Sequence, residues 1–229
     1  MTARVKRHEY GSREDLAEGL ASGIAAVLAG GIAMDGTATL AVSGGSTPDL
    51  LFDHLSREPI EWGAVTVLPV DDRLVHPAHE RSNARLIRER LLVNSAAAAN
   101  FASMGERDGR LSIADDEASV AVAGAERIDA IVLGMGTDGH TASFFADGDS
   151  YREATDPGGA VPVLPIRTPG QPEARITLTM PVILRARFLA LHIEGEAKRD
   201  VFERALAGDD LPMARVLAHA EEINLFWTA

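Results

Sequence analysis

The chain has 229 residues, 46% of them hydrophobic, so it can bury a sizeable core as one large α/β domain or two small ones. Its formal net charge of −12 argues against a broad basic surface for nucleic acid or an anionic membrane, so any phosphate must be held by a local pocket. Cys is absent, which excludes a disulfide framework, a thiolate nucleophile and a thiolate metal ligand.

The N-terminal residues and the apolar stretches of the chain predict a cytoplasmic protein. The N-terminal residues lack the apolar segment of a signal peptide. No apolar run approaches the length of about 18 residues that a membrane span requires. We therefore expect neither export nor membrane insertion.

Apolar periodicity predicts alternating helices and strands along the chain. Leu16, Leu20 and Ile24 recur at helical spacing after Ser12, which predicts a first helix that ends at Gly30 and Gly31. The further elements expected, in chain order, are a strand at 37–42, a helix at 49–57, a strand at 64–70, helices at 82–93 and 112–127, strands at 128–133, 174–179 and 188–195, a helix at 196–207 and a last strand at 222–227.

This alternation is typical of an α/β fold with three layers, in which a mostly parallel sheet is flanked by helices. No boundary divides the chain, so we expect a single domain over residues 1–229. The Pro- and Gly-rich stretch 156–173 is interpreted as a surface loop that flanks one short strand.

The segment SGGSTP at 43–48 follows the strand at 37–42. Glycine backbone, two hydroxyls and the start of a helix could together hold a phosphate. By itself, the segment is better explained as an ordinary turn, with Thr47 as the N-cap and Pro48 at the first helical position.

Asp71, Asp72 and Arg73 come directly after the strand at 64–70. They could orient a polar substrate or handle protons, and they could equally form a solvated loop with a local salt bridge. His76 and His79 follow, but no third ligand stands at a recognisable spacing, so we expect loop histidines and no metal.

The segment LGMGTDGHTASFF at 133–145 is the most informative. It begins at the end of the apolar run IDAIVL, which predicts a strand buried on both faces. We expect His140 near the start of a helix, where the helix dipole favours a neutral ring that can accept a proton. Asp138 could orient that ring or a substrate hydroxyl, or it could merely cap the turn.

Lys198 stands on the first turn of the predicted helix at 196–207, where its ammonium group can reach a phosphate. The alternative is that Lys198, like most exposed lysines, only makes the protein surface more soluble. Four strand ends thus supply hydroxyls and amides, carboxylates with an arginine, a histidine and a lysine. This set suits a phosphorylated small molecule that undergoes proton transfer.

Five segments together resemble the 6-phosphogluconolactonase family, within the wider group that includes glucosamine-6-phosphate deaminases. They are SGGSTP, VDDRLVHPAHERSNARLI, LGMGTDGHTASFF, ARITLT and IEGEAK, in the order the family has them. The resemblance implies a modified Rossmann-like sheet and hydrolysis of 6-phosphoglucono-1,5-lactone to 6-phosphogluconate in the pentose phosphate pathway. It also implies that no metal or organic cofactor is needed.

The resemblance also implies roles for individual residues. His140 would be the general base that activates water, and Asp71, Arg73 and Asp138 would complete the pocket. The residues implied to hold the phosphate are Gly44, Gly45, Ser46, Thr47 and Lys198. No G-x-S-x-G turn surrounds any serine, which argues against a serine esterase with Ser143 as nucleophile.

Two departures from the family pattern stand out. Asp72 occupies a position that is usually glutamate, which could alter a supporting contact. Gly170 occupies the usual lysine position in the loop before ARITLT, so that a supporting cation is lost there or is replaced by Arg167.

Two other functions compete with the lactonase. A glucosamine-6-phosphate deaminase/isomerase would continue the histidine motif with a glutamate where this chain has Phe145, whose side chain moves no proton. A non-catalytic sugar-phosphate sensor would need a DNA-binding module, for which there is no basic patch and no room. The expected partner is therefore a small phosphosugar lactone, bound by a monomer or a small homo-oligomer, with no nucleic acid and no membrane.

Overall fold

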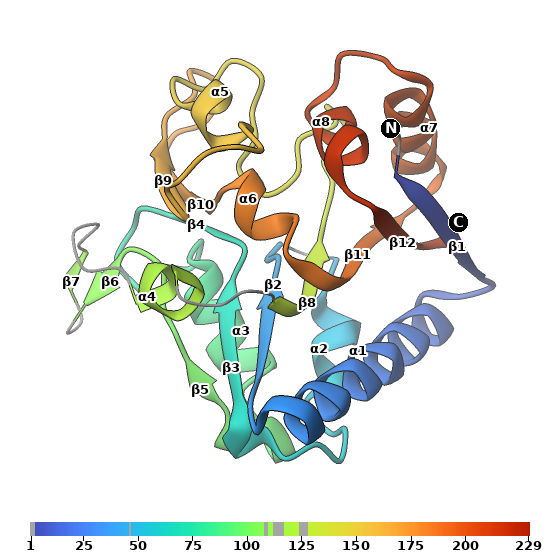
Figure 1. Ribbon diagram of the computed structural model, residues 1–229, viewed down its shortest axis with the longest axis vertical. Helices are drawn as coiled ribbons and strands as arrows, with labels where there is room; N and C mark the ends of the chain where they lie inside the picture. Colours follow the sequence, from blue (N-terminus) through green and yellow to red (C-terminus); the bar gives the residue numbers. More distant parts are fainter. Residues whose placement is uncertain (1–2, 46, 108–109, 112–116, 124–127) are drawn as a thin grey trace.

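The computed structural model describes residues 3–45, 47–107, 110–111, 117–123 and 128–229. At its centre is a seven-stranded sheet in the order β1-β12-β11-β8-β2-β3-β5, in which every neighbouring pair is parallel (Figure 1). The strands are β1 (Arg4–Tyr10), β2 (Ala38–Val42), β3 (Val65–Pro69), β5 (Asn100–Phe101), β8 (Ile128–Leu133), β11 (Ala186–Glu194) and β12 (Glu222–Thr228). The prediction of an α/β fold with a mostly parallel sheet is confirmed.

Helices cover both faces of this sheet, because its central strands are apolar on both sides. On β8, Ile131 and Leu133 belong to one buried cluster, whereas Ala130 and Val132 belong to the other. The first cluster includes residues of α4 (Glu117–Ala123), α6 (Met180–Ile183), α7 (Glu196–Ala207) and α8 (Pro212–His219), and the second includes residues of α1 (Arg13–Asp35), α2 (Asp49–Leu55) and α3 (Asn83–Arg90). The short α5 (Tyr151–Ala154) and the 3₁₀ turns Trp62–Ala64 and Asn94–Ala98 complete the helical elements described.

Helix α1 begins as predicted, with the Ser12 side chain accepting a hydrogen bond from the Asp15 amide at 3.1 Å. It does not end at Gly30 and Gly31 but continues to Asp35, and Gly36 follows with a φ of 77°. The interior glycine has a packing reason, since a Cβ at Gly31 would collide with the Asp129 side chain. Close contact with the sheet, rather than helix termination, therefore explains this residue.

By length and composition alone, α1 could also cross a membrane. The sequence-based expectation that no segment could span a membrane considered only uninterrupted apolar runs. Helix α1 includes the charged Glu18, so it was not counted, although the helix as a whole is long and apolar enough. In the fold, Leu16, Leu20 and Ile24 are completely buried in the core. A helix packed in a protein core passes the same test of composition.

Two smaller sheets flank the main one. Strands β4 (Asp71–Arg73), β10 (Arg175–Leu178) and β9 (Val163–Ile166) form an antiparallel sheet in the order β4-β10-β9, and β6 (Glu106–Arg107) pairs with β7 (Arg110–Leu111). The short strand expected within 156–173 is thus present. The segment after β3, expected to be entirely loop, instead begins with a strand that pairs with β10.

Most predicted helices are present with shorter bounds. Helices α2 and α3 end at Leu55 and Arg90, before the predicted ends, whereas α7 has the predicted range. The helix predicted at 112–127 is seen as α4, and the remaining residues of that range lie outside the described part of the chain. Strand β1 was not predicted, because RVKRHEY is largely polar and exposed at the sheet edge.

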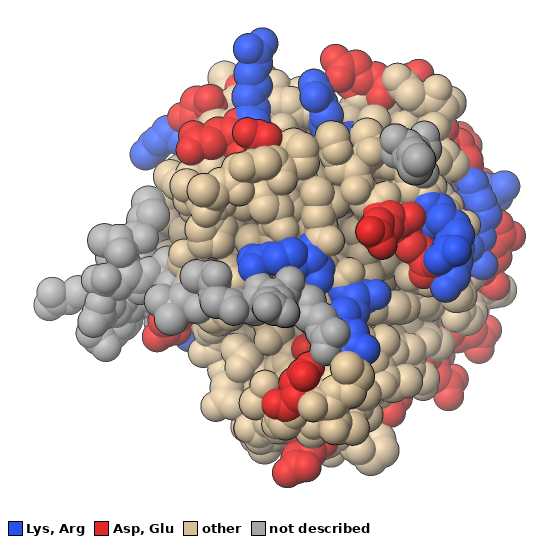
Figure 2. Space-filling model, in the orientation of Figure 1, with Lys and Arg blue, Asp and Glu red and all other residues tan. Residues whose placement is uncertain are grey.

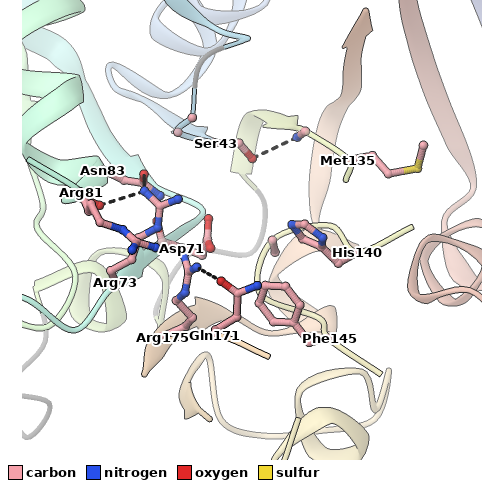
Figure 3. A pocket seen from close by; sticks show the side chains of 14 residues that line it. Ser43, Asp71, Arg73, Arg81, Asn83, Met135, His140, Phe145, Gln171 and Arg175 are labelled. Carbon is pink, nitrogen blue, oxygen red and sulfur yellow. Dashed lines mark hydrogen bonds between the residues drawn. The ribbon is translucent and has the colours of Figure 1, made fainter. Parts of the chain in front are cut away.

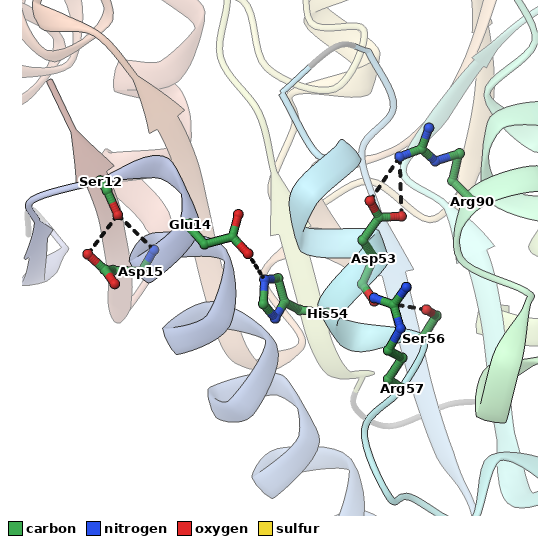
Figure 4. Close-up of polar contacts among 8 residues, drawn as sticks. All are labelled: Ser12, Glu14, Asp15, Asp53, His54, Ser56, Arg57 and Arg90. Carbon is green, nitrogen blue, oxygen red and sulfur yellow. Dashed lines mark hydrogen bonds and ion pairs between the residues drawn. The ribbon is translucent and has the colours of Figure 1, made fainter.

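Polar contacts join the three helices on one face of the sheet (Figure 4). His54 Nε2 on α2 lies 2.7 Å from Glu14 Oε1 on α1. Arg90 on α3 donates to both carboxylate oxygens of Asp53 on α2, at 3.1 and 3.2 Å. These exposed pairs add little stability, and the apolar contacts beneath them hold the layer together.

The chain order places a crevice at the centre of the sheet. From β2 the chain proceeds to β3 and β5 on one side, whereas β8, β11 and β12 lie on the other. The order therefore reverses between β2 and β8, and open parallel sheets bind ligands at the carboxyl ends of strands at such a point. Figure 2 shows acidic and basic side chains interspersed over the described part of one face.

Candidate active site

A cavity of about 280 Å³ lies at the carboxyl ends of β2, β3 and β8 (Figure 3). Its walls come from the loops after these strands and from β10 and the loop before it. The lining residues are Ser43, Gly44, Gly45, Asp71, Arg73, Arg81, Asn83, Gly134, Met135, His140, Ala142, Phe145, Gln171 and Arg175. Predicted residues from three of the four segments, namely Gly44, Gly45, Asp71, Arg73 and His140, are thus brought to one place.

The SGG turn after β2 packs tightly between its neighbours. The Ser43 amide donates to the Val132 carbonyl at 2.9 Å, and the Ser43 hydroxyl accepts from the Gly134 amide at 3.1 Å. Gly45 has a φ of 99°, and a Cβ at Gly44 would overlap the Asn83 side chain. The glycines are therefore needed for conformation and for close approach, and they leave backbone facing the cavity.

His140 and Asp138 form the pair that the sequence predicted. His140 Nδ1 lies 2.5 Å from Asp138 Oδ1, and the same oxygen accepts from the His140 amide at 3.2 Å. Asp138 thus both caps the turn and orients the ring. Burial alone would raise the pKa of Asp138, but the charge of His140 and hydrogen bonds from its side chain and backbone bring that pKa below its ordinary value.

The prediction that His140 stands at a helix start is wrong. Residues 134–150 form turns, and the next helix, α5, begins only at Tyr151. The ring is held by Asp138 and by stacking on Phe145, with ring centroids 4.5 Å apart. A charge partner and an aromatic ring, rather than a helix dipole, define the surroundings of His140.

Asp71 lines the cavity and is held from two sides. The Ser143 hydroxyl donates to Asp71 Oδ2 at 2.5 Å, and Asn83 Nδ2 donates to the Asp71 carbonyl at 2.7 Å. Ser143 lies in the same loop as His140, so this bond joins the loop after β8 to strand β4. Ser143 is itself fully buried, which suits a positioning role rather than that of a nucleophile.

Asp72, by contrast, turns away from the cavity. Its carboxylate accepts from the amides of Arg73, Asn83 and Ala84 at 2.7, 2.6 and 2.8 Å, and from the Ser82 hydroxyl at 3.1 Å. Burial is the main cause that raises its pKa, with a smaller effect from Asp71, against three backbone hydrogen bonds that lower it. This carboxylate therefore anchors the N-terminus of α3, and the two adjacent aspartates have different tasks.

Three arginines line the cavity, Arg73, Arg81 and Arg175, and only Arg73 was predicted from the sequence. Arg73 donates from Nη1 to the Arg81 carbonyl at 2.8 Å and to Asn83 Oδ1 at 3.0 Å. Arg175 faces Arg73 in the β4–β10 register and donates to Gln171 Oε1 at 2.7 Å. Arg175 was not predicted from the sequence, although a charged residue at the start of the buried strand RITL could have indicated it.

Arg167, expected as a replacement cation, is exposed and is not among the residues that line the cavity. Its backbone amide donates to Asp149 Oδ1 at 2.9 Å. The structure instead supplies Arg81 and Arg175 to the cavity wall. Arg175 is brought there by the antiparallel pairing of β10 with β4.

Lys198 and Thr47 lie next to the cavity without forming its described lining. Lys198 is on the first turn of α7, as predicted, and its Nζ donates to Thr47 Oγ1 at 3.4 Å. Thr47 is not the N-cap of α2, since Pro48 occupies that position and the helix begins at Asp49. Ser46, the remaining predicted phosphate ligand, lies outside the described residues.

The loop histidines make only local contacts. His76 Nδ1 accepts from the Ala78 amide at 3.2 Å, and His79 Nδ1 accepts from the Arg81 amide at 3.1 Å. Within the described part of the chain, no three His, Asp or Glu side chains gather as a metal would require.

Residues 11–227 match the family model described as glucosamine-6-phosphate isomerases/6-phosphogluconolactonase. The chain belongs to this family. A 6-phosphogluconolactonase of Mesorhizobium japonicum is 43% identical over 95% of this chain and 93% of that protein, and one of Rhizobium meliloti is 40% identical over 96% and 97%. The crystal structure of a 6-phosphogluconolactonase from Shewanella baltica, 35% identical, matches with a TM-score of 0.92 and covers both chains completely.

Proposed function

We propose that this chain is a cytoplasmic 6-phosphogluconolactonase that hydrolyses 6-phospho-D-glucono-1,5-lactone to 6-phospho-D-gluconate in the oxidative branch of the pentose phosphate pathway. The observation that carries the proposal is the pair of His140 and Asp138 beside a cavity with arginines on its wall. We infer that residues 1–229 act as one domain with a small-molecule substrate, as a monomer or small homo-oligomer.

The chemistry requires one base and one path for its proton. Asp138, with its lowered pKa, is a carboxylate near neutral pH and accepts a hydrogen bond from the protonated Nδ1 of His140, which leaves a lone pair on Nε2. Nε2 takes a proton from water as the water oxygen bonds to C1 of the lactone. The electron pair of the C1 carbonyl moves to its oxygen, and the tetrahedral intermediate carries a negative charge there.

Collapse of this intermediate completes the reaction. The carbonyl re-forms, the bond from C1 to the ring oxygen breaks, and that oxygen takes the proton held by His140. The carboxylic acid then releases a proton to solvent. No covalent enzyme intermediate is required, because a lactone already reacts slowly with water and needs chiefly positioning, a base and donors for the oxyanion.

The phosphate is assigned to the turn after β2 and the start of α7. Gly44 and Gly45 present backbone at the cavity, and Lys198 stands beside Thr47, so one cation and several donors lie at the ends of β2 and β11. Ser46 is included in this site on the family resemblance. Asp71 and Arg73 line the cavity between this region and β10 and are assigned to the sugar.

The deaminase alternative lacks a group it would need. Phe145 packs flat on His140, with an angle of 29° between the rings, at the position where a deaminase would have a glutamate. An apolar ring there can neither take up nor release a proton. This contact favours simple hydrolysis over a reaction that moves protons between sugar carbons.

The test is the rate of 6-phosphogluconolactone hydrolysis by the purified protein, corrected for spontaneous ring opening. We expect fast turnover that falls by about 10²- to 10⁴-fold in His140→Asn, whose amide cannot act as a base. Glucosamine 6-phosphate is assayed in parallel for ammonia release. Hydrolysis no faster than the spontaneous rate, or ammonia release, would overturn the proposal.

A further inference from the structure

Arg175 is a buried arginine whose side chain donates to a neutral amide, that of Gln171. The residue is only 5% exposed, and it lies opposite Arg73, a second cation, in the pairing of β4 with β10. The Nε atoms of both arginines are buried and have no hydrogen-bond partner within the described residues. Two facing guanidinium groups are unfavourable unless an anion joins them.

Neighbouring groups relieve this charge only in part. Arg81, the third arginine, forms an ion pair with Glu173 at 3.1 Å. Arg175 instead donates to the neutral amide of Gln171. Burial first, and then the charge of Arg73, lower the pKa of Arg175, whereas the carboxylates of Asp71 and Glu173 raise it. The net effect lowers this pKa, so the two carboxylates offset burial and the facing cation only in part.

The Phe145 ring contacts both this guanidinium and the proposed base. One contact of the ring is the stacked imidazole of His140, at 4.5 Å between centroids. The Arg175 Cζ lies 5.8 Å from the same ring centroid. The base and the guanidinium are therefore both in contact with one aromatic ring that lines the cavity (Figure 3).

The lysine assigned to the phosphate enters from another part of the sheet edge. Lys198 follows β11, whereas β4 follows β3 after one residue, Val70. Strands β11 and β3 are three positions apart in the sheet, which corresponds to about 14 Å at the usual strand spacing. The Lys198 side chain returns toward β2, where Nζ contacts Thr47. Lys198 and the arginines therefore enter the site from different elements, and the reaction product carries a phosphate at one end and a carboxylate at the other.

We propose that Arg175, supported by Arg73, is a catalytic residue that donates hydrogen bonds to the C1 oxygen of the lactone as that oxygen becomes negative, and then binds the product carboxylate. This inference rests on the proposed lactonase function and assigns its oxyanion site. The C1 oxygen of the bound lactone is neutral and becomes negative in the transition state, so its interaction with the guanidinium groups strengthens there.

Kinetics of Arg175→Gln test the first half of the proposal. Loss of an oxyanion donor should lower kcat by about 100-fold with little change in KM. Arg175→Lys retains a charge without the forked donors and should recover part of the lost kcat. The matched control is Arg152→Gln, which removes an exposed arginine on α5 outside the cavity and should retain full activity. Circular dichroism and thermal unfolding establish which variants are folded. If Arg175→Gln is not folded, the kinetics of Arg175→Lys provide the test.

Binding of two ligands tests the second half without turnover. Calorimetric titration compares 6-phosphogluconate with glucitol 6-phosphate, which has the same phosphate but a hydroxymethyl group in place of the carboxylate. We expect Arg175→Gln to weaken the binding of 6-phosphogluconate by at least about 10-fold and to leave the affinity for glucitol 6-phosphate unchanged. Only 6-phosphogluconate has a charged group at C1. Lys198→Met should weaken both ligands equally.

Equal weakening of both ligands by Arg175→Gln would place the phosphate at the arginines and overturn the proposal. Unchanged affinity for both, together with wild-type kcat, would also overturn it. If the wild-type protein fails to hydrolyse the lactone, the proposed function fails, whereas selective loss of 6-phosphogluconate binding would still identify Arg175 as the carboxylate ligand.

Discussion

Replacement of Asp72 by alanine should destabilise the protein strongly while removing nothing that lines the cavity. The residue is 2% exposed, and its carboxylate accepts four hydrogen bonds, three from backbone amides and one from Ser82. A buried donor left without an acceptor costs about 1–3 kcal/mol. Water entry and relief of the buried charge offset part of this loss, so we expect Asp72→Ala to lower the free energy of unfolding by about 3–5 kcal/mol.

The measurement is urea denaturation followed by circular dichroism, with Asp72→Asn as the isosteric control. Asparagine keeps one acceptor oxygen, so about half of the loss is expected, or about 2 kcal/mol. Equal m-values are needed for the comparison. If the free energy of unfolding of Asp72→Ala lies within about 1 kcal/mol of the wild-type value, the four hydrogen bonds do not anchor α3 and the reasoning is wrong.

The pH dependence of this difference has a defined sign. Because the pKa of Asp72 is raised by folding, its contribution to stability is fully present below the ordinary carboxyl pKa and is lost as pH rises through the raised value. The gap in stability between wild type and Asp72→Asn should therefore narrow as pH rises through that window. A gap that widens would contradict the assigned direction.

Three further changes test other contacts of the site. Gly44→Ala should raise KM and lower the free energy of unfolding by about 1–3 kcal/mol, because its Cβ overlaps Asn83, and thermal unfolding with kinetics would detect both. Ser143→Ala should lower kcat/KM by about 10-fold, because the hydrogen bond to Asp71 is lost. A kcat/KM equal to that of the wild type would show that Ser143 has no positioning role. Asp138→Asn should lower kcat by at least about 100-fold. The lowered pKa keeps Asp138 ionised through the ordinary carboxyl range, and its charge is lost only as pH falls through the lowered value. This deficit should therefore persist across neutral pH and shrink in acid.

Predictions from the sequence succeeded where a residue's role depends on near neighbours in the chain. The pairing of Asp138 with His140 spans two residues and needs only a tight turn. The cap by Ser12 is similarly local. These arrangements follow from the short range over which a turn or a helix start is determined.

Predictions from the sequence failed where contacts between distant segments determine the local structure. The helix expected at His140 is absent, because the residues after it pack against β4 and β10 instead, as the Ser143 bond to Asp71 illustrates. Gly31 looked like a helix end, yet it is explained by the side chain of Asp129 on β8. No periodicity within one segment records such contacts.

The amino-acid sequence by itself determined the alternation of strands and helices, the polar segments at the strand ends and the local pair of His140 with Asp138. Only the tertiary structure separated Asp71, which lines the cavity, from Asp72, which anchors α3. Only the tertiary structure also brought Arg175 to the cavity, because the antiparallel register of β10 with β4 decides which residue faces Arg73. Hydrophobic periodicity specifies which faces are buried, whereas pairing between distant strands specifies which charges meet there.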